Sequence, residues 1–383
     1  MIDIKIGNSF ELIKDLKDSS IDCIVTSSPY YSKRSYHCPP VIFDAKEGCE
    51  HEWTSEIKVS RHKKGETNPG LEAHYKENDA IDESAGQFCT RCPAWRGELG
   101  KELTPEDFIR HLLDFFSLAK PKLKDTGTCF INLGDTRMGS MQGYGLIKEP
   151  ASKIDDVNKG FYCSSEGLPP TARKHPILKP KSLCLVPERF AWGMIEQGYI
   201  LRNKIIWKKS NSKPESVKDR FSDTHEFVYF FVKSPHYYFN LDAVRKPFAA
   251  STLVRAKGQF ISEKSKGEQS YLQADAQRKF SDKILSGEVV GGNPGDLWWL
   301  ATSSYRGEHY ATYPVSLVER CVLSGCPPKG TVLDPFAGSG TTGEFCRRHD
   351  RNAILFELNP SCMSMLSDRT MSHTPELSHW FKV

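Results

Sequence analysis

The stretch TVLDPFAGSGTTGEFCRRHDRNAILFELNP, residues 331–360, decides the fold. Its apolar start predicts a strand that ends at Asp334, followed by a glycine-rich turn and a helix. A second predicted strand, AILFE, ends in Glu357, 23 residues after Asp334. Three glycines have the G-x-G-x-x-G spacing: Gly338, Gly340 and Gly343. In such units the glycines admit the backbone close to a nucleotide, and the acid accepts hydrogen bonds from ribose hydroxyls.

The position of this unit in the chain narrows the class of fold. A tight strand-to-helix turn, with Glu357 as a solvated strand end, is the structural alternative to nucleotide binding. Only 40 residues follow Gly343, too few for the further strand–helix units that a dinucleotide fold requires. We therefore expect the amino-terminal part to complete the sheet, in a circularly permuted order. That order argues against an NAD enzyme.

The amino-terminal part supplies strands of the expected kind. IDIKI, residues 2–6, alternates, and IDCIVTS, residues 21–27, has the pattern of a buried strand. The second of these strands runs directly into the sequence SSPYY. Later helices and strands alternate along the chain, which favours an α/β sheet.

Two motifs together resemble a known family. DPFAGSGTT near the carboxyl terminus and TSSPYY near the amino terminus are similar to motifs of the β-class, circularly permuted, S-adenosylmethionine-dependent DNA amino-methyltransferases, which modify cytosine N4 or adenine N6. The segments KSLCLVPERFAWGMIEQGYILRNKIIWKK, HEFVYFFVKSPHYYF and HYATYP resemble the middle of such enzymes. The resemblance implies an α/β, Rossmann-like methyltransferase core with a mostly parallel central sheet.

The resemblance also implies a cofactor site. Glu357 would hold the ribose hydroxyls of S-adenosylmethionine, and Asn8 stands where the family usually has an aspartate near the adenine. Asn8 can hydrogen-bond but carries no charge. Tyr313, with Pro314, would flank the methionine end, although a helix start explains this pair equally well. The remaining residues expected to line the methionine and ribose are Asp334, Phe336, Gly338 and Gly340.

The catalytic motif of the family corresponds here to Ser27, Ser28, Pro29 and Tyr30, with serine where the second position is usually proline. An exocyclic amine is a poor nucleophile, and acceptors aimed at its N–H groups favour a pyramidal nitrogen. The Ser27 hydroxyl and a carbonyl fixed by Pro29 would supply them, while Tyr30 would stack on a base turned out of the duplex. Serine at the first position favours cytosine N4, with adenine N6 as the alternative.

Four residues predict a metal site in a long polar insertion. Cys49, His51, Cys89 and Cys92 form Cys-x-His and Cys-x-x-Cys pairs, a ligand set suited to tetrahedral structural zinc. Two unrelated thiol pairs in a loop are the alternative. Trp53 and Trp95 are expected to pack around the metal.

Composition and periodicity divide the chain into five expected parts. Residues 1–48 form the catalytic-motif half of the core, 49–92 the zinc-clipped insertion and 93–245 the middle of the core. Residues 246–296 lack periodicity and carry scattered Lys and Arg, so they form a candidate target-recognition region that contacts DNA phosphates and bases, or simply a solvated face. Residues 297–383 form the cofactor-binding half.

Overall composition fits these expectations. Net charge is +4, and no apolar run approaches the ~20 residues of a membrane span. Twelve cysteines without an export signal indicate a reducing cytoplasm, in a prokaryotic cell or from a phage-encoded protein. The expected partner is double-stranded DNA, with a cognate restriction endonuclease system as a further candidate partner and the protein a monomer or a homodimer. A non-catalytic zinc DNA-binding protein and another nucleotide-dependent enzyme, such as an oxidoreductase, remain alternatives.

Overall fold

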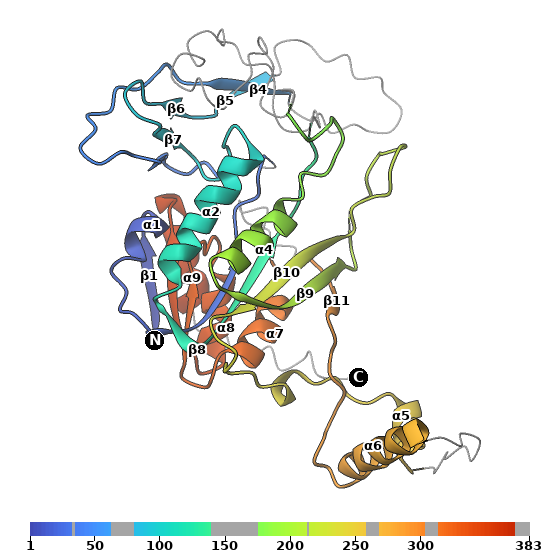
Figure 1. Ribbon diagram of the computed structural model, residues 1–383. Coiled ribbons are helices and arrows are strands. Elements are labelled where there is room, and N and C mark those ends of the chain that lie inside the picture. The colour runs from blue at the N-terminus through green and yellow to red at the C-terminus, as the bar shows by residue number, and fades with distance from the viewer. Residues whose placement is uncertain are drawn as a thin grey trace.

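The computed structural model describes residues 1–32, 35–62, 80–138, 175–212, 214–257, 268–302 and 313–371. Parts of the predicted segments lie outside them, among them 63–79 of the insertion, 139–174 of the middle of the core, 258–267 of the recognition region and 309–312 of HYATYP. The central feature of the described residues is an eight-stranded sheet (Figure 1). Its strands, in spatial order, are β1 (Ile2–Ile6), β13 (Asn352–Glu357), β12 (Thr331–Asp334), β2 (Ile21–Ser27), β8 (Leu123–Leu133), β10 (His225–Val232), β9 (Ile200–Lys209) and β11 (Leu297–Leu300).

The two ends of the chain share this sheet. β1 pairs in parallel with β13, placing Ile4 opposite Leu355, and β12 pairs in parallel with β2, placing Val332 opposite Cys23. β2 is parallel to β8 and β11 to β9, whereas β10 is antiparallel to both of its neighbours. The amino-terminal strands therefore complete the sheet that the glycine turn begins, as the position of that turn predicted.

Helices cover both faces of the sheet, because successive strand residues point to opposite sides. Ile24 belongs to the buried cluster beneath α1, α2 and α4, whereas its neighbours Cys23 and Val25 belong to the cluster beneath α7, α8 and α9. The resulting arrangement has three layers (Figure 1). The helices are α1 (Ser9–Leu12), α2 (Pro105–Ala119), α4 (Val186–Glu196), α7 (Val315–Gly325), α8 (Thr341–Arg348) and α9 (Met363–Met371), the last preceded by the 3₁₀ turn η4 (Pro360–Cys362).

The start of α2 shows how local sequence sets an element. The Thr104 hydroxyl accepts a hydrogen bond from the Asp107 backbone N–H at 3.1 Å, and Pro105 occupies the first helical position. Phe108, Leu112 and further residues of the same stripe are completely buried against the sheet. The capping residues therefore set where this helix begins.

The insertion and the segments that flank it form two small sheets beside the core. β3 (Val41–Phe43), β7 (Trp95–Gly97) and β6 (Gln87–Phe88) make one, while β4 (Lys58–His62) and β5 (Ala80–Ser84) make the other. Trp95 stacks on Phe43 with ring centroids 5.4 Å apart, and Phe43 in turn stacks on His111 of α2 at 4.3 Å. The first small sheet is therefore anchored to the main core by aromatic packing.

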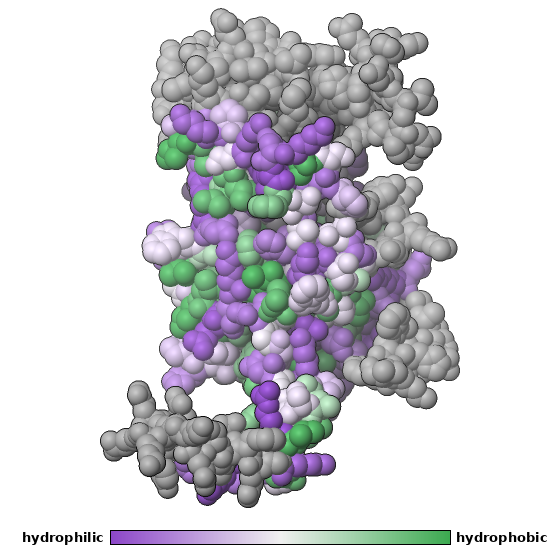
Figure 2. Space-filling model, turned by 90° about the vertical axis from the view of Figure 1, so that its right-hand side faces the viewer, coloured by the Kyte–Doolittle hydropathy of each residue, from purple (hydrophilic) through white to green (hydrophobic). Residues whose placement is uncertain are grey.

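Residues 246–296 differ from the irregular segment that their lack of periodicity predicted. They contain α5 (Ala250–Lys257) and α6 (Glu268–Leu285), which follow the 3₁₀ turn η3 (Asp242–Val244). The two helices pack on each other and project from the body of the molecule (Figures 1 and 2). Helix formers such as Ala, Gln, Lys and Leu favour α6, but a helix that does not pack against the main sheet needs no regular apolar stripe.

Within the described part of the chain, no helix combines the length and apolar character required to cross a bilayer.

Candidate active site

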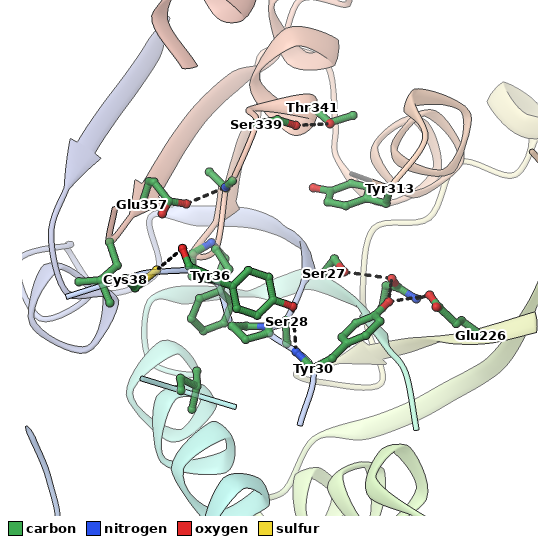
Figure 3. A pocket seen from close by; sticks show the side chains of 18 of the residues that line it. Ser27, Ser28, Tyr30, Tyr36, Cys38, Glu226, Tyr313, Ser339, Thr341 and Glu357 are labelled. Atoms are coloured by element: carbon green, nitrogen blue, oxygen red, sulfur yellow. Dashed lines mark hydrogen bonds between the residues drawn. The ribbon is translucent and has the colours of Figure 1, made fainter. Parts of the chain in front are cut away.

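A cavity of about 720 Å³ opens where β1, β2, β12 and β13 end. Most of the predicted site residues meet in it, although they come from both ends of the chain (Figure 3). The predicted residues that line it are Asn8, Ser27, Ser28, Pro29, Tyr30, Tyr313, Phe336, Gly338 and Glu357. Asp334 and Gly340 are not part of its lining.

The glycine turn forms one wall. Gly338 and Gly340 have φ of +51° and +80°, a conformation that favours glycine. A Cβ on Gly338 would have no atom within 4 Å, so this glycine leaves open space at the wall. A Cβ on Gly340 would lie 2.9 Å from Leu366 Cδ2. Gly340 therefore serves the packing of α9 against the turn.

Glu357 is fixed at the cavity wall by backbone groups. Its two carboxylate oxygens accept hydrogen bonds from the N–H groups of Gly338 and Asn359, both at 2.8 Å. These bonds hold the carboxylate, which is 8% exposed, against the glycine turn (Figure 3). The geometry agrees with the predicted pairing of the turn with the acid that ends the next strand.

Asp334 lies completely buried beneath the same turn. Its carboxylate accepts hydrogen bonds from the hydroxyls of Thr342 at 2.6 Å, Tyr313 at 2.7 Å and Thr26 at 2.8 Å. Burial raises the pKa of Asp334, and these hydroxyls partly oppose the shift. Asp334 thereby joins β12 to β2 and α8, and it orients the Tyr313 side chain that lines the cavity.

The opposite wall is built around Asn132 of β8. Ser27 is opposite Asn132 in the β2–β8 register, and its hydroxyl donates to Asn132 Oδ1 at 3.0 Å. Asn132 Nδ2 donates to the Phe227 carbonyl at 3.0 Å, which fixes the orientation of the amide. The predicted catalytic hydroxyl is thus held in place by a side chain more than a hundred residues away.

Tyr30 extends this network. Its hydroxyl lies 2.6 Å from Glu226 Oε2 and 3.0 Å from Asn132 Oδ1 (Figure 3), and Glu226 also pairs with Lys209. Burial and the charge of Glu226 raise the pKa of Tyr30. A Cβ on Gly134 would lie 2.9 Å from the Tyr30 ring, so the ring position requires glycine there.

The same wall contains a chain of hydrogen bonds through Tyr36 and a buried hydroxyl, that of Ser28. The Tyr36 hydroxyl accepts from the Tyr30 N–H at 3.2 Å, and Glu98 Oε1 accepts from the Tyr36 N–H at 2.5 Å. The Ser28 hydroxyl is buried and has no hydrogen-bond partner among the described residues. Burying an unpaired hydroxyl is costly, which is characteristic of a group that meets a ligand.

Sequence reasoning missed several residues of this wall: Tyr36, Glu98, Asn132, Lys209 and Glu226. A signal existed for two of them. Asn132 stands in the apolar run CFINL near the end of β8, and Glu226 directly precedes the apolar run FVYFFV of β10. A polar side chain in a buried strand needs a partner, but the sequence alone does not reveal which strands are neighbours.

The four predicted metal ligands come together. The ligand atoms of Cys49, His51, Cys89 and Cys92 all lie within 4.8 Å of one another. Cys49 Sγ is 4.0 Å from Cys89 Sγ, and Cys92 Sγ is 3.4 Å from His51 Nδ1. A tetrahedral zinc with bonds of about 2.3 Å to sulfur separates its sulfurs by about 3.8 Å, so these residues fit such an ion.

The surroundings of this cluster favour a thiolate at Cys89. Although burial opposes it, hydrogen bonds from the Arg91 N–H and from His51 lower the pKa of Cys89 to about 6.

Of the two tryptophans expected around the metal, one lies there and the other does not. Trp53 lies beside His51 with ring centroids 5.0 Å apart, as predicted. Trp95 instead packs on Phe43, and its indole N–H donates to the Ala85 carbonyl at 3.2 Å. Trp95 therefore belongs to the main core.

Comparison with known proteins agrees with this architecture. The family model N6_N4_Mtase, described as DNA methylase, matches residues 21–368. The Type II methyltransferase M.SmaI of Serratia marcescens is 32% identical over 275 residues, 72% of this chain and 78% of that protein. M.Cfr9I of Citrobacter freundii, also a Type II methyltransferase, is 28% identical over 368 residues, 95% and 85% of the two chains.

The fold has a counterpart among solved structures. The PvuII DNA methyltransferase (cytosine-N4-specific) superposes with a TM-score of 0.51 at 15% identity, covering 98% of this chain and 88% of that one. Together, the sheet, the site and the family match define a methyltransferase. The chain belongs to the N6/N4 family of DNA methylases, as the resemblance of its two motifs predicted.

Proposed function

We propose that the protein transfers a methyl group from S-adenosylmethionine to the N4 amine of a cytosine turned out of double-stranded DNA, at specific sites. The main support is the shared cavity, in which the SSPY motif faces the glycine turn and Glu357. Adenine N6 remains the alternative target, since both amines need acceptors and either base can stack on an aromatic ring.

The chain's own residues define the chemistry of the target amine. Asn132 holds the Ser27 hydroxyl at the cavity wall, so a Ser27 lone pair can accept from one amine N–H. The unpartnered Ser28 hydroxyl and the carbonyl before Pro29 are further acceptors nearby. Serine is a weak base, so the amine proton leaves during or after transfer rather than before it. Positioning and electrostatics carry the catalysis.

The proposed cofactor occupies the other wall. When bound, S-adenosylmethionine supplies an electrophilic methyl group on its sulfonium. Glu357 would accept from the ribose hydroxyls, Asn8 would lie toward the adenine, and Phe336, Gly338 and Tyr313 would border the methionine and ribose. Asp334 and Gly340 would contribute from beneath, by holding Tyr313 and the turn in place.

The target base and site can be measured together. Plasmid DNA methylated by the purified protein is digested to nucleosides and examined by mass spectrometry, while methylome sequencing locates the sites. N4-methylcytosine is the expected product. N6-methyladenine without methylcytosine would transfer the proposal to the alternative base, and no methylation of any DNA would reject the activity.

We propose that the Cys49, His51, Cys89 and Cys92 cluster binds one structural zinc that secures the insertion, residues 49–92. Four soft ligands leave no open coordination position, which is typical of a structural site. Freshly purified protein should contain about one zinc per chain, and Cys89→Ser should lose it. Protein free of zinc after growth with added zinc would reject the site.

The remaining proposals concern the DNA and the cellular setting. Residues 246–296, whose helices α5 and α6 project from the body, would form a target-recognition region. This region and the insertion, residues 49–92, would divide the methyltransferase core into the three parts 1–48, 93–245 and 297–383. Similarity to Type II methyltransferases supports a place beside a restriction endonuclease in a prokaryotic cytoplasm. Salt-dependent DNA binding that weakens when Arg278 and Lys279 are replaced by Ala would support the first of these.

A further inference from the structure

The loop between β9 and β10, residues 210–224, borders the cavity and carries an unusual side chain. Asn211, Ser212, Glu215 and Asp223 line the cavity. Phe221 does not line it and is 97% exposed, more than the other large apolar side chains of the described residues. A solvent-exposed phenylalanine beside the catalytic cavity has apolar surface that only a partner can bury.

Three ion pairs involve this loop, one within the loop and two with residues outside it. Arg220 donates to Glu215 at 2.8 Å, Arg137 donates to Asp223 at 2.9 Å, and Lys181 donates to Asp219 at 2.6 Å. Arg220 also donates to the Phe221 carbonyl at 2.8 Å. The partners Arg137 and Lys181 come from outside the loop. These contacts link the loop to Arg137 and Lys181, while the Phe221 side chain is 97% exposed.

We propose that Phe221 is a wedge, which enters the base stack of the DNA and fills the space left when the target base turns out into the cavity. A planar apolar ring can stack on the neighbouring bases, and aromatic or aliphatic wedges are a known means of opening a base step. Asp223, two residues after Phe221, lines the cavity that would receive the base, so the loop carries Phe221 close to that cavity. This inference rests on the proposed function and adds the group that stabilises the opened duplex.

The test compares matched and mispaired DNA. Sites mapped by methylome sequencing are built into two duplexes, one with the target base paired and one with it mispaired, since a mispaired base costs less to turn out. Single-turnover methylation is measured for the wild type, Phe221→Ala and Phe221→Trp. Trp192→Ala is the control, because Trp192 is also an exposed aromatic (64%) but lies on α4.

For Phe221→Ala, we expect the rate on the paired duplex to fall at least about tenfold, the size of one lost stacking contact. On the mispaired duplex it should return to within about threefold of the wild type. Phe221→Trp should keep the rate on both duplexes, and the thermal unfolding midpoint should not change in either variant. Trp192→Ala should behave as the wild type.

Two outcomes would overturn the wedge: an unchanged rate for Phe221→Ala, or an equal loss on both duplexes, which would indicate an ordinary DNA contact. Failure of the proposed function is a separate result, because the wild type would then methylate neither duplex.

Discussion

The two walls of the cavity are built in different ways. The wall proposed to hold the cofactor, here named the cofactor wall, comes mainly from one short stretch, the turn after β12 and the end of β13, and backbone N–H groups hold its carboxylate, Glu357. The wall proposed to hold the target base, the target wall, joins Ser27, Tyr30, Asn132 and Glu226, which come from three strands and a loop, and side chains hold one another there.

This difference shows what each wall is suited to do. Backbone hydrogen bonds depend little on side-chain identity, so the cofactor wall offers a fixed shape to one invariant ligand. The target wall offers hydroxyl, amide and carboxylate groups whose exchange would alter which base fits. It also contains the unpartnered Ser28 hydroxyl, a group that a bound base could satisfy.

The largest expected effect is on the methylation rate and comes from a change in the target wall alone. Ser27→Ala removes an acceptor for the target amine while leaving the glycine turn intact. We expect the single-turnover methylation rate to fall about 10²–10³-fold, the scale for losing one preorganised hydrogen bond in a transition state. The affinity for S-adenosylmethionine, measured by calorimetry, should not change.

Ser20→Ala is a matched control for this variant, because Ser20 stands just before the other end of β2 and its hydroxyl donates to the Lys17 carbonyl. A Ser27→Ala enzyme with a normal rate would remove Ser27 from the chemistry. A loss of cofactor affinity instead would show that the walls are not independent.

The contrast also explains what the sequence could predict. Residues 331–360 carry strand, turn, helix and acid within one stretch, so the cofactor wall and the permuted sheet followed from local pattern. Asn132 and Glu226 could not be placed, because their roles depend on β8 lying beside β2 and β10 beside β8 in the sheet, a consequence of tertiary packing. Asp334 was predicted at the right turn, but its burial under three hydroxyls depends on the distant Thr26 and Tyr313.

A second variant tests the cofactor wall by itself. Glu357→Ala removes the acceptor for the ribose hydroxyls and also frees the Gly338 N–H. S-adenosylmethionine binding should weaken by about 1.5–3 kcal/mol, the range for hydrogen bonds to a charged group. Calorimetry measures this directly, with Glu196→Ala, which removes an exposed carboxylate at the end of α4, as the control.

Unchanged affinity in Glu357→Ala would exclude this carboxylate from the cofactor site. Glu357→Gln, which keeps an acceptor, should lose less than the alanine variant. A loss of similar size in both would indicate that the charge itself is required.

The stability of the protein should depend on pH through a buried histidine, His111, next to the cavity. His111 is buried between Glu102 and Asp44, at 3.1 and 3.0 Å, and Phe43 of the cavity lining stacks on its ring. Burial opposes its charge, but hydrogen bonds to Asp44 and Glu102 prevail and raise the pKa of His111 to about 9. The stabilisation is therefore complete below the unfolded-state pKa of about 6.5 and is lost as pH rises through 9.

Because solvent reaches Asp44, we expect the free energy of unfolding to fall by about 1–2 kcal/mol between pH 6.5 and 9.5. Urea unfolding at a series of pH values measures it. His111→Gln should be less stable at pH 6.5 and should lack this part of the pH dependence. A wild type and variant with parallel pH profiles would show that folding does not raise the pKa of His111.

The smallest expected effect distinguishes the two roles of Tyr30. Tyr30→Phe keeps the ring but removes the hydroxyl that contacts Glu226 and Asn132, whereas Glu226 retains Lys209. Losing one hydrogen bond of this kind should cost about 1 kcal/mol of unfolding free energy. Base binding should be nearly unchanged in Tyr30→Phe, but Tyr30→Ala should weaken it by about 1–3 kcal/mol through lost stacking.

Fluorescence anisotropy of the duplex with a mispaired target base measures the DNA affinity of both variants. Equal weakening in the two would assign the binding energy to the hydroxyl network rather than to the ring. The target wall would then bind its base through polar side chains alone, in contrast to the backbone groups that form the cofactor wall.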